Sequence, residues 1–221
     1  MTLFRLDASI RQEGSVSREV ADTLQRVWHE HHPTEAVVRR DLAAEPLSAD
    51  AWPHAVAAGA TPEDARTPAQ RDAVALASRL ADEVLAADAV VVATPLYNFG
   101  VSQHLKTWTD LLITDPRFGP GQRPLQGKPV TIAVARGGGY APGTPREGWD
   151  HATPYVERIF RDVLGGDVAV VTAELTLADA TPQMADLRDL AAASRSAARE
   201  LAESTARAHA RLVALARTGA A

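Results

Sequence analysis

The chain has no cysteine and few aromatic residues, which make up 5% of its 221 positions. The lack of cysteine excludes disulfides, iron–sulfur clusters, thiolate zinc sites and cysteine nucleophiles within this sequence. A surplus of positive charge is also missing, since 23 Lys and Arg face 28 Asp and Glu, for a net charge of −5. No overall basic field therefore favours nucleic acid or an anionic membrane as a partner.

Long hydrophobic runs are absent as well. The strongest run, residues 89–93, is far too short to span a bilayer. Arg5 and Asp7 interrupt the first apolar stretch, which argues against a secretory signal and favours a cytoplasmic protein with no membrane partner. The chain is 46% hydrophobic and 23% charged, as globular proteins are, and we expect a single domain over residues 1–221.

The order of the predicted elements indicates the fold class. Short apolar segments alternate with helical patterns, and the strands are predicted at residues 2–8, 36–42, 88–94, 129–135 and 167–173. The third segment is nearly all apolar or β-branched, which is typical of a strand covered on both faces. This alternation predicts an α/β fold of the flavodoxin-like type, with a doubly wound five-stranded parallel sheet and helices on both faces.

Helix signals lie between these strands. Thr67 and Gln70 match a capping box at the start of one helix, and Thr153 is expected to cap another. The long connection at residues 43–66 is expected to be functional or partly helical. An Ala-rich region, about 181–217, is expected to form a C-terminal helix that is bent or split.

Three loops leave the carboxyl ends of predicted strands, where ligands bind in sheets of this kind. The first, residues 7–17, places three hydroxyls around the start of a helix, whose free amides carry partial positive charge. This arrangement suits a phosphate, although Ser15 could instead serve only as the helix cap. Since the dinucleotide and P-loop fingerprints are both missing, a single phosphate is expected.

The other two loops suit a flat heteroaromatic ligand. Residues 94–100 hold two aromatic side chains beside Asn98, which would supply an apolar wall and a polar contact. Residues 136–140 contain consecutive glycines, which let N–H groups approach a ligand closely. Residues 94–100 could instead form a turn whose aromatic side chains fill the core, and residues 136–140 could be only a flexible turn. Together the three loops match the needs of flavin mononucleotide (FMN).

These loops, in this order and spacing, resemble those of the FMN-dependent NADH:azoreductase and quinone reductase family. The similarity covers roughly residues 2–175, and PLYNFGVSQHLKTWTD at 95–110 is its most specific part. The resemblance implies transfer of two electrons from NADH or NADPH, through FMN, to a small aromatic acceptor such as a quinone or an azo compound, in a ping-pong cycle. It also implies a homodimer with the flavin ring in a cleft between subunits.

The resemblance also points to the residues of the FMN site. On the phosphate side they are Ser9, Arg11, Ser15, Val16 and Ser17. Along the ring they are Pro95, Leu96, Tyr97, Asn98 and Phe99, and at its pyrimidine edge Arg136, Gly137, Gly138 and Gly139. Asn98 and Arg136 are expected to give electrostatic support, and no side chain is expected to act as an obligatory acid or base.

The chain departs from the family pattern in three places. After Glu174, the family's usual A-E-G continuation is missing. Ala135 stands where the family often has a hydroxyl residue, and residues 159–164 replace an aromatic-rich stretch that helps to wall the substrate cleft, with Asp162 at an aromatic position. A flavoenzyme that tailors a specialised metabolite therefore stays open as an alternative. An FMN-binding electron carrier is a second alternative, although the connection at 43–66 and the long C-terminal helix argue against it.

Four histidines receive no catalytic role. His31 and His32 lie near a predicted helix end with no carboxylate spaced to complete a metal site, so we expect them on the solvated surface. His104 and His151 lie near the proposed cleft, but a lone histidine is more often a surface residue. We therefore expect no metal site.

Overall fold

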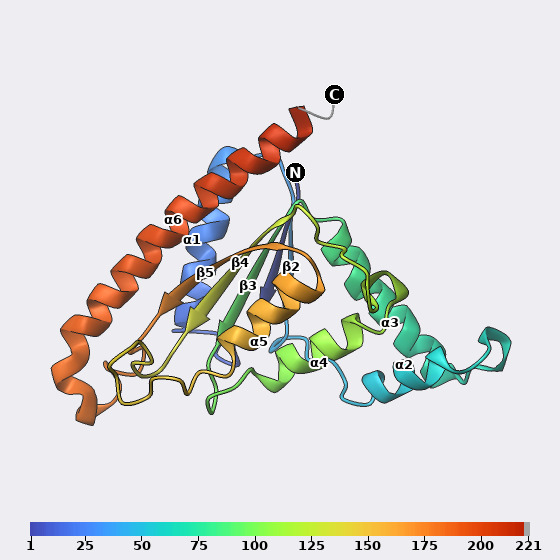
Figure 1. Cartoon of the computed structure of the whole chain (residues 1–221), viewed down its shortest axis with the longest axis horizontal. Helices are drawn as coiled ribbons and strands as arrows, with labels where there is room; N and C mark the ends of the chain where they lie inside the picture. The colour runs from blue at the N-terminus through green and yellow to red at the C-terminus, as the bar shows by residue number, and fades with distance from the viewer. Residues whose placement is uncertain (219–221) are drawn as a thin grey trace.

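The computed structural model describes residues 1–218, and its centre is a five-stranded sheet in the order β2-β1-β3-β4-β5 (Figure 1). The strands are β1 (Leu3–Asp7), β2 (Val37–Asp41), β3 (Ala89–Pro95), β4 (Pro129–Ala135) and β5 (Asp167–Ala173). Every neighbouring pair is parallel, so the chain must cross back between strands, and it does so through helices. The predicted doubly wound flavodoxin-like arrangement is confirmed.

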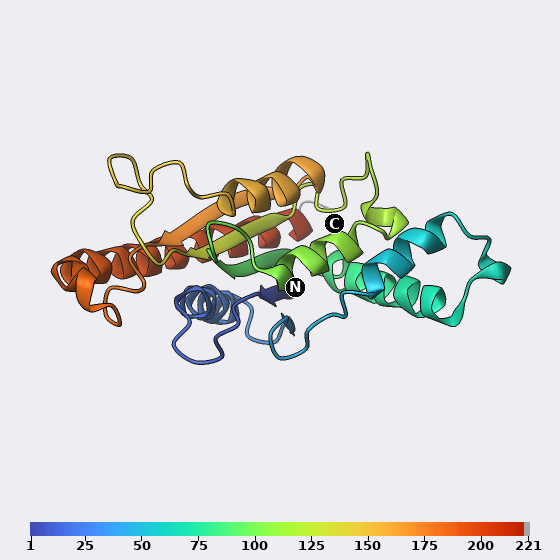
Figure 2. The ribbon, with the colours of Figure 1, turned by 90° about the horizontal axis from the view of Figure 1, so that it is seen from below.

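Helices cover both faces of this sheet. They are α1 (Val16–His31), α2 (Ala51–Gly59), α3 (Pro68–Leu85), α4 (Gln103–Leu112), α5 (Thr153–Glu157) and α6 (Arg188–Thr218). Helices α1 and α6 lie side by side on one face, and α3, α4 and α5 lie on the other (Figures 1 and 2). The connection at 43–66 contains α2 and a 3₁₀ turn, Glu63–Ala65, so its expected partial helicity is confirmed.

Two helix starts show how capping works in this chain. At α3, Thr67 Oγ1 accepts from the Gln70 N–H at 3.2 Å, and Gln70 Oε1 accepts from the Thr67 N–H at 2.8 Å, which confirms the capping box. The expected cap at Thr153 is wrong, because Thr153 is already helical and follows Ala152. Asp150 instead accepts from the N–H groups of Ala152 and Thr153, both at 2.9 Å, since its carboxylate lies over the first amides.

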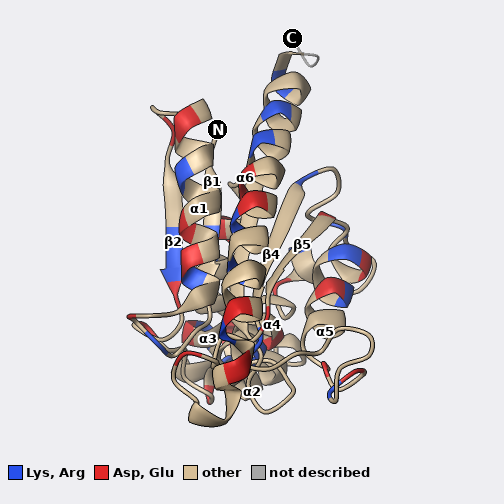
Figure 3. Ribbon diagram, turned by 90° about the vertical axis from the view of Figure 1, so that its left-hand side faces the viewer, with Lys and Arg blue, Asp and Glu red and all other residues tan. Residues whose placement is uncertain are grey.

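The two faces of the sheet have different cores. On the α3–α5 face, the Trp108 ring stacks between Phe4 and Phe160, with centroid distances of 6.3 and 6.2 Å. On the other face α6 buries mainly small residues, Ala198, Ala202, Ala206, Ala210 and Val213. Charged residues of both signs follow the outer sides of α1 and α6, as solvated faces do (Figure 3).

The C-terminal region is divided near its start. A 3₁₀ turn, Pro182–Leu187, precedes the single 31-residue helix α6, so the expected split lies at residue 188. His31 is exposed as predicted, but His32 is half-buried against the Trp28 ring, at 4.6 Å. Burial lowers the pKa of His32, so the surface prediction was wrong for this residue. Within residues 1–218, every helix is too short or too polar to cross a bilayer.

Candidate functional site

A cleft of about 230 Å³ opens at the carboxyl edge of the sheet, where the loops after β1, β3, β4 and β5 meet. Figure 2 shows the molecule from this side. We call it the central cleft, and its lining residues are Ser9, Arg11, Gly14, Ser15, Val16, Pro95, Leu96, Tyr97, Ala135, Gly137, Thr176 and Leu177. It gathers more than half of the residues expected to bind FMN, from segments that are far apart in the chain.

The amino end of α1 forms one end of this cleft. Ser15 is the residue before the helix, but within the described residues its side chain makes no cap hydrogen bond. Its Oγ lies 3.3 Å from Ser17 Oγ, and both residues are buried. Ser15, whose hydroxyl the helix does not use, lines the cleft beside the first amides of a 16-residue helix and can meet phosphate oxygens there, whereas Ser17 lies behind it and is not among the lining residues. The geometry favours the phosphate interpretation of Ser15 over a purely structural cap.

Tyr97 joins this end of the cleft to the loop after β3. Its hydroxyl lies 3.3 Å from Ser9 Oγ and accepts from the Ile10 N–H at 3.2 Å. Ser9 Oγ in turn accepts from the Arg11 N–H at 3.2 Å. Tyr97 therefore helps to shape the loop at residues 9–11 as well as the cleft wall. Its position in the sequence did not indicate this role.

Residues 97–100 form a tight hairpin that splits the expected ring-binding segment. Tyr97 and Gly100 exchange two backbone hydrogen bonds of 3.0 and 2.9 Å. Asn98 and Phe99 both have left-handed backbones, with φ of 47° and 67°, as a type I′ turn requires. Phenylalanine rarely adopts this conformation, and such strain concentrates at functional loops.

This turn places Asn98 and Phe99 outside the central cleft. Asn98 lines a second, more open hollow of about 610 Å³, together with Ile10 and His104. Phe99 is exposed and meets Trp149 edge to face, with ring centroids 5.4 Å apart. Pro95, Leu96 and Tyr97 are thus the residues of this segment that face the central cleft.

Arg136 is directed into the protein. Its guanidinium lies 2.7 Å from Asp150 and 2.9 Å from Glu174, and it donates to the Thr153 hydroxyl at 3.2 Å. Two carboxylates therefore offset its charge, and the wall of the cleft at this point is formed by Ala135 and Gly137. The geometry shows Arg136 linking three loops instead of presenting a charge to a ligand.

The glycines after Arg136 leave their N–H groups available. The carbonyls of Arg136, Gly137 and Gly138 accept hydrogen bonds of 3.0 to 3.2 Å from the segment 175–177. In the part of the chain that the structure describes, the N–H groups of Gly137, Gly138 and Gly139 donate to no protein group. A Cβ at Gly137 would lie 2.7 Å from Leu177 Cδ1, so a larger residue here would require the Leu177 side chain to shift.

The segment that departs from the family pattern includes a π-helical turn, Arg158–Val163, directly after α5. Phe160 is buried under the sheet beside Trp108. Asp162 pairs with Arg158 at 3.0 Å, and both side chains are more than half exposed. Within one chain, this carboxylate is therefore a surface group.

Comparison with known proteins decides the family. A family profile described as the flavodoxin-like fold matches residues 1–211. The chain belongs to this flavodoxin-like family. Relatives named FMN-dependent NADH:quinone oxidoreductase include one from Kineococcus radiotolerans, 42% identical over 207 residues, covering 90% of this chain and 97% of the relative. Another, from Parafrankia sp., is 38% identical over 207 residues, with 92% and 98% coverage.

Solved structures agree with the flavodoxin-like fold. The crystal structure of an azoreductase from Bacillus anthracis matches with a TM-score of 0.76, covering 93% of this chain and 98% of that one. At 24% identity this likeness supports the fold alone. The relatives named above confirm the resemblance to the quinone reductase family that the three loops indicated.

Residues of this flavodoxin-like chain that sequence reasoning missed lie mainly after β5. Thr176 and Leu177 line the central cleft, but their segment carries no motif. The parallel sheet was the available signal, because the end of β5 must lie at the same edge as the other loops. Gly14 was also missed, and its left-handed backbone, with φ of 64°, is a glycine conformation.

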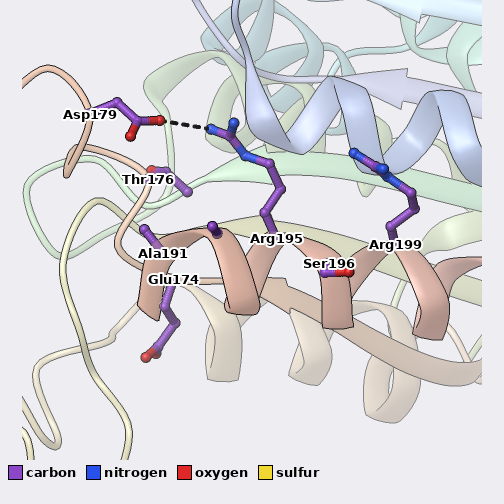
Figure 4. Close-up of a pocket in the computed structure, with 8 residues that line it drawn as sticks. Glu174, Thr176, Asp179, Ala191, Arg195, Ser196 and Arg199 are labelled. Carbon is purple, nitrogen blue, oxygen red and sulfur yellow. Dashed lines mark ion pairs between the residues drawn. The ribbon is translucent and has the colours of Figure 1, made fainter. Parts of the chain in front are cut away.

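A further hollow of about 210 Å³ adjoins the central cleft and shares Thr176 with it (Figure 4). Two arginines of α6, Arg195 and Arg199, line it together with Glu174 and Asp179. Arg195 reaches Asp179 at 4.0 Å, a loose ion pair. Glu174 also pairs with Arg136, so both carboxylates of this hollow already have an arginine partner within the described residues.

Proposed function

We propose that this chain is an FMN-dependent oxidoreductase that passes two electrons from NADH to a quinone or an azo compound, with NADPH as the alternative donor. The observation that carries this proposal is the meeting of free hydroxyls at the start of α1 and free glycine amides in one region at the sheet edge. The relatives named FMN-dependent NADH:quinone oxidoreductase support it.

The residues present fit FMN. The buried Ser15–Ser17 hydroxyl pair and the helix amides suit one phosphate with its double negative charge. Leu96 and Tyr97 supply an apolar wall, and the amides of 137–139 can meet the polar edge of a flat ring. Among residues 1–218 the cleft offers no comparable cradle for a second phosphate, so we expect FMN and not FAD.

Bound FMN supplies the hydride chemistry. The chain's own residues then have to bind, orient and stabilise charge. The amides of Gly137, Gly138 and Gly139 are held by their neighbours' hydrogen bonds and so act as preorganised donors toward negative charge at the ring edge. Tyr97, fixed by Ser9 and Ile10, keeps water from one side of the cleft.

We further propose a ping-pong order, in which the nicotinamide donor leaves the central cleft before the acceptor binds there. The reason is that both would have to contact the flavin ring in this cleft. Steady-state rates with NADH and a benzoquinone both varied test this proposal. Parallel double-reciprocal lines are expected, whereas intersecting lines would overturn the ping-pong order.

The cofactor and the enzyme class need a separate test. The protein should purify yellow, with FMN as the released flavin, and NADH should bleach it without oxygen. FAD as the main flavin would overturn the FMN assignment. Absence of bleaching by NADH and by NADPH would favour an electron carrier.

We also propose a homodimer. The side chains at the rim of the sheet edge include three large exposed ones, Ile10 at 59%, Trp149 at 52% and Phe99 at 37%. Clustered apolar groups of this size favour burial against a second copy, as the family resemblance implies. Light scattering at micromolar concentration should give twice the chain mass, and a monomer mass would overturn the proposal.

Acceptor choice is the last part of the proposal. The surface pair of Arg158 and Asp162 puts charge where the family has an aromatic wall. We therefore expect kcat/KM to be higher for small quinones than for bulky azo dyes. The reverse order, measured with both acceptors at saturating NADH, would contradict this preference.

A further inference from the structure

A network of charged residues lies beneath the phosphate end of the central cleft. Asp7, at the end of β1, is fully buried and contacts three arginines. Arg5 Nε lies 3.1 Å from its carboxylate, Arg39 Nε 2.6 Å and Arg18 Nη1 3.4 Å. Asp41, at the end of β2, is the second carboxylate of the network. Buried charges of this kind are costly unless they are paired, so the network fixes its members tightly.

Arg18 differs from the other two arginines in what it holds. It is 5% exposed, and its Nε donates to the Arg11 carbonyl at 2.9 Å while Nη2 donates to the Ser9 carbonyl at 2.8 Å. The opposite edge of the guanidinium pairs with Asp41 at 2.6 and 2.9 Å. One side chain on α1 therefore ties the loop at 9–11 to β2.

The two carbonyl oxygens that Arg18 engages belong to residues that line the central cleft. A carbonyl oxygen that faced a phosphate would repel it, and Arg18 turns both of these oxygens into the protein. The same contacts fix Ser9, whose hydroxyl meets Tyr97 and the Arg11 N–H. The shape of the loop thus depends on a residue that lies behind it.

We propose that Arg18 is a positioning residue for the cofactor phosphate: it holds the backbone of residues 9–11 so that Ser9 and the start of α1 face the phosphate. This inference rests on the proposed function, since it assumes that FMN binds in the central cleft. Arg18 acts through the loop and not by direct contact.

Asp41 keeps Arg18 in place at every working pH. Burial opposes ionisation of Asp41, but hydrogen bonds from Arg18 and from the N–H groups of Ala44 and Ala43 outweigh it and lower the pKa to about 2. The hydrogen bond to Asp41 also raises the pKa of Arg18. The pair is therefore permanently charged near neutral pH.

Titration of the flavin-free protein with FMN and with riboflavin, followed by flavin fluorescence, tests the proposal. Riboflavin lacks the phosphate, so a residue that positions the phosphate loop should affect FMN alone. Arg18→Met should weaken FMN binding by about 10- to 100-fold and change riboflavin binding by less than about twofold. Arg18→Lys keeps the charge but cannot span two carbonyls, so we expect a folded protein with about tenfold weaker FMN binding.

Arg39→Met is the matched control, because Arg39 contacts Asp7 in the same network but donates to neither loop carbonyl. It should keep FMN affinity within about twofold of wild type. An unchanged ratio of FMN to riboflavin affinity in Arg18→Lys, or an equal loss in Arg39→Met, would overturn the role of Arg18. Wild-type protein that binds neither flavin would instead overturn the proposed function, and if Arg18→Met does not fold, Arg18→Lys decides.

Discussion

Arg18 and Arg136 lie at opposite ends of the central cleft, and each connects a loop to the elements around it. Arg18 donates to two loop carbonyls, and its Asp7 neighbour is shared among three arginines. Both arginines meet two carboxylates, Asp41 and Asp7 for Arg18 and Asp150 and Glu174 for Arg136, but the remaining bond of Arg136 goes to the Thr153 hydroxyl and not to a loop carbonyl. The hydrogen-bond partners of an arginine therefore determine its role. Arg18 fixes the backbone of a loop, whereas Arg136 links side chains.

The largest effect is expected from the hydroxyls at the phosphate end. Changing Ser15 and Ser17 together to Ala should weaken FMN binding by about 3 to 6 kcal/mol, since each hydrogen bond to a charged group contributes about 1.5 to 3 kcal/mol. Fluorescence titration of the flavin-free variant measures this loss. Ser196→Ala, which removes an exposed hydroxyl on α6, is the control. Wild-type affinity in the double variant would place the phosphate elsewhere.

Removing Arg136 should give a different kind of defect. Arg136→Met leaves Asp150 and Glu174 without their cation, so we expect a loss of about 2 to 4 kcal/mol in the free energy of unfolding. FMN and riboflavin affinities should fall by the same factor, because in the proposed site this loop meets the ring and not the phosphate. Urea unfolding and paired titrations measure both quantities. A loss of FMN affinity without a loss of riboflavin affinity would show that Arg136 also affects phosphate binding, which would contradict the comparison.

The pH dependence of the Arg18 end follows from Asp41. Its pKa falls from an ordinary 3.8 to about 2 on folding, so ionised Asp41 stabilises the fold above pH 4, and this contribution is lost as the pH falls through about 2. Asp41→Asn should therefore be about 2 kcal/mol less stable at pH 7, with the difference shrinking below pH 4. Urea unfolding of both proteins between pH 7 and pH 2.5 measures it, and a constant difference would contradict the pairing.

At Asn98, two substitutions can separate the effect of the left-handed backbone from the effect of the side-chain carboxamide. Asn98→Gly removes the carboxamide but keeps the left-handed turn, whereas Asn98→Ala also strains it, so Ala should be about 1 kcal/mol less stable than Gly. If the carboxamide supports the flavin, both variants should slow flavin reduction by NADH, by about three- to tenfold. A wild-type rate in Asn98→Gly, measured by stopped flow, would leave only the turn as the role of Asn98.

The histidines near the cleft should have the smallest effects. His151 is linked to Phe99 through its backbone N–H, at 2.9 Å, which Ala retains. His104 lines the second hollow and not the central cleft. Both Ala variants should keep kcat within about twofold of wild type, because the proposed mechanism requires no side chain as an acid or base. A tenfold loss in either variant would require a proton-transfer step.

Much of the fold was predictable because local patterns and packing agree. The bounds of β4 and β5 match the predicted ranges, since each apolar run is closed by a charged residue, a proline or glycines. At α5 the local Thr-Pro signal misled, because Asp150, three residues before Thr153, supplied the better acceptor.

The site was predictable where the chemistry lies in short motifs and not where it depends on long-range contacts. Ser15 and Tyr97 came from such motifs, and both line the cleft. Arg18 stands only a few residues from Ser15, yet its partners lie on β1, β2 and the loop, and pairing of charges across a fold has no periodic signature. The left-handed Phe99 opposes local preference and follows from hairpin closure alone.

The row of alanines on α6 affects how precisely this helix is positioned along α1. Alanines recur at 198, 202, 206 and 210, so a slide of α6 by four residues along α1 would bury nearly the same surface. Apolar packing alone would then permit two registers of similar energy. Polar contacts at the two ends remove this ambiguity: Ser194 Oγ accepts from the Glu174 N–H at 2.9 Å, and Arg217 pairs with Asp88 at 3.0 Å. Contacts in the middle of α6 add to these, since Arg26 pairs with Glu203 at 2.8 Å and Thr131 Oγ1 lies 3.2 Å from His209 Nδ1, so polar contacts along the whole helix set the register of its small residues.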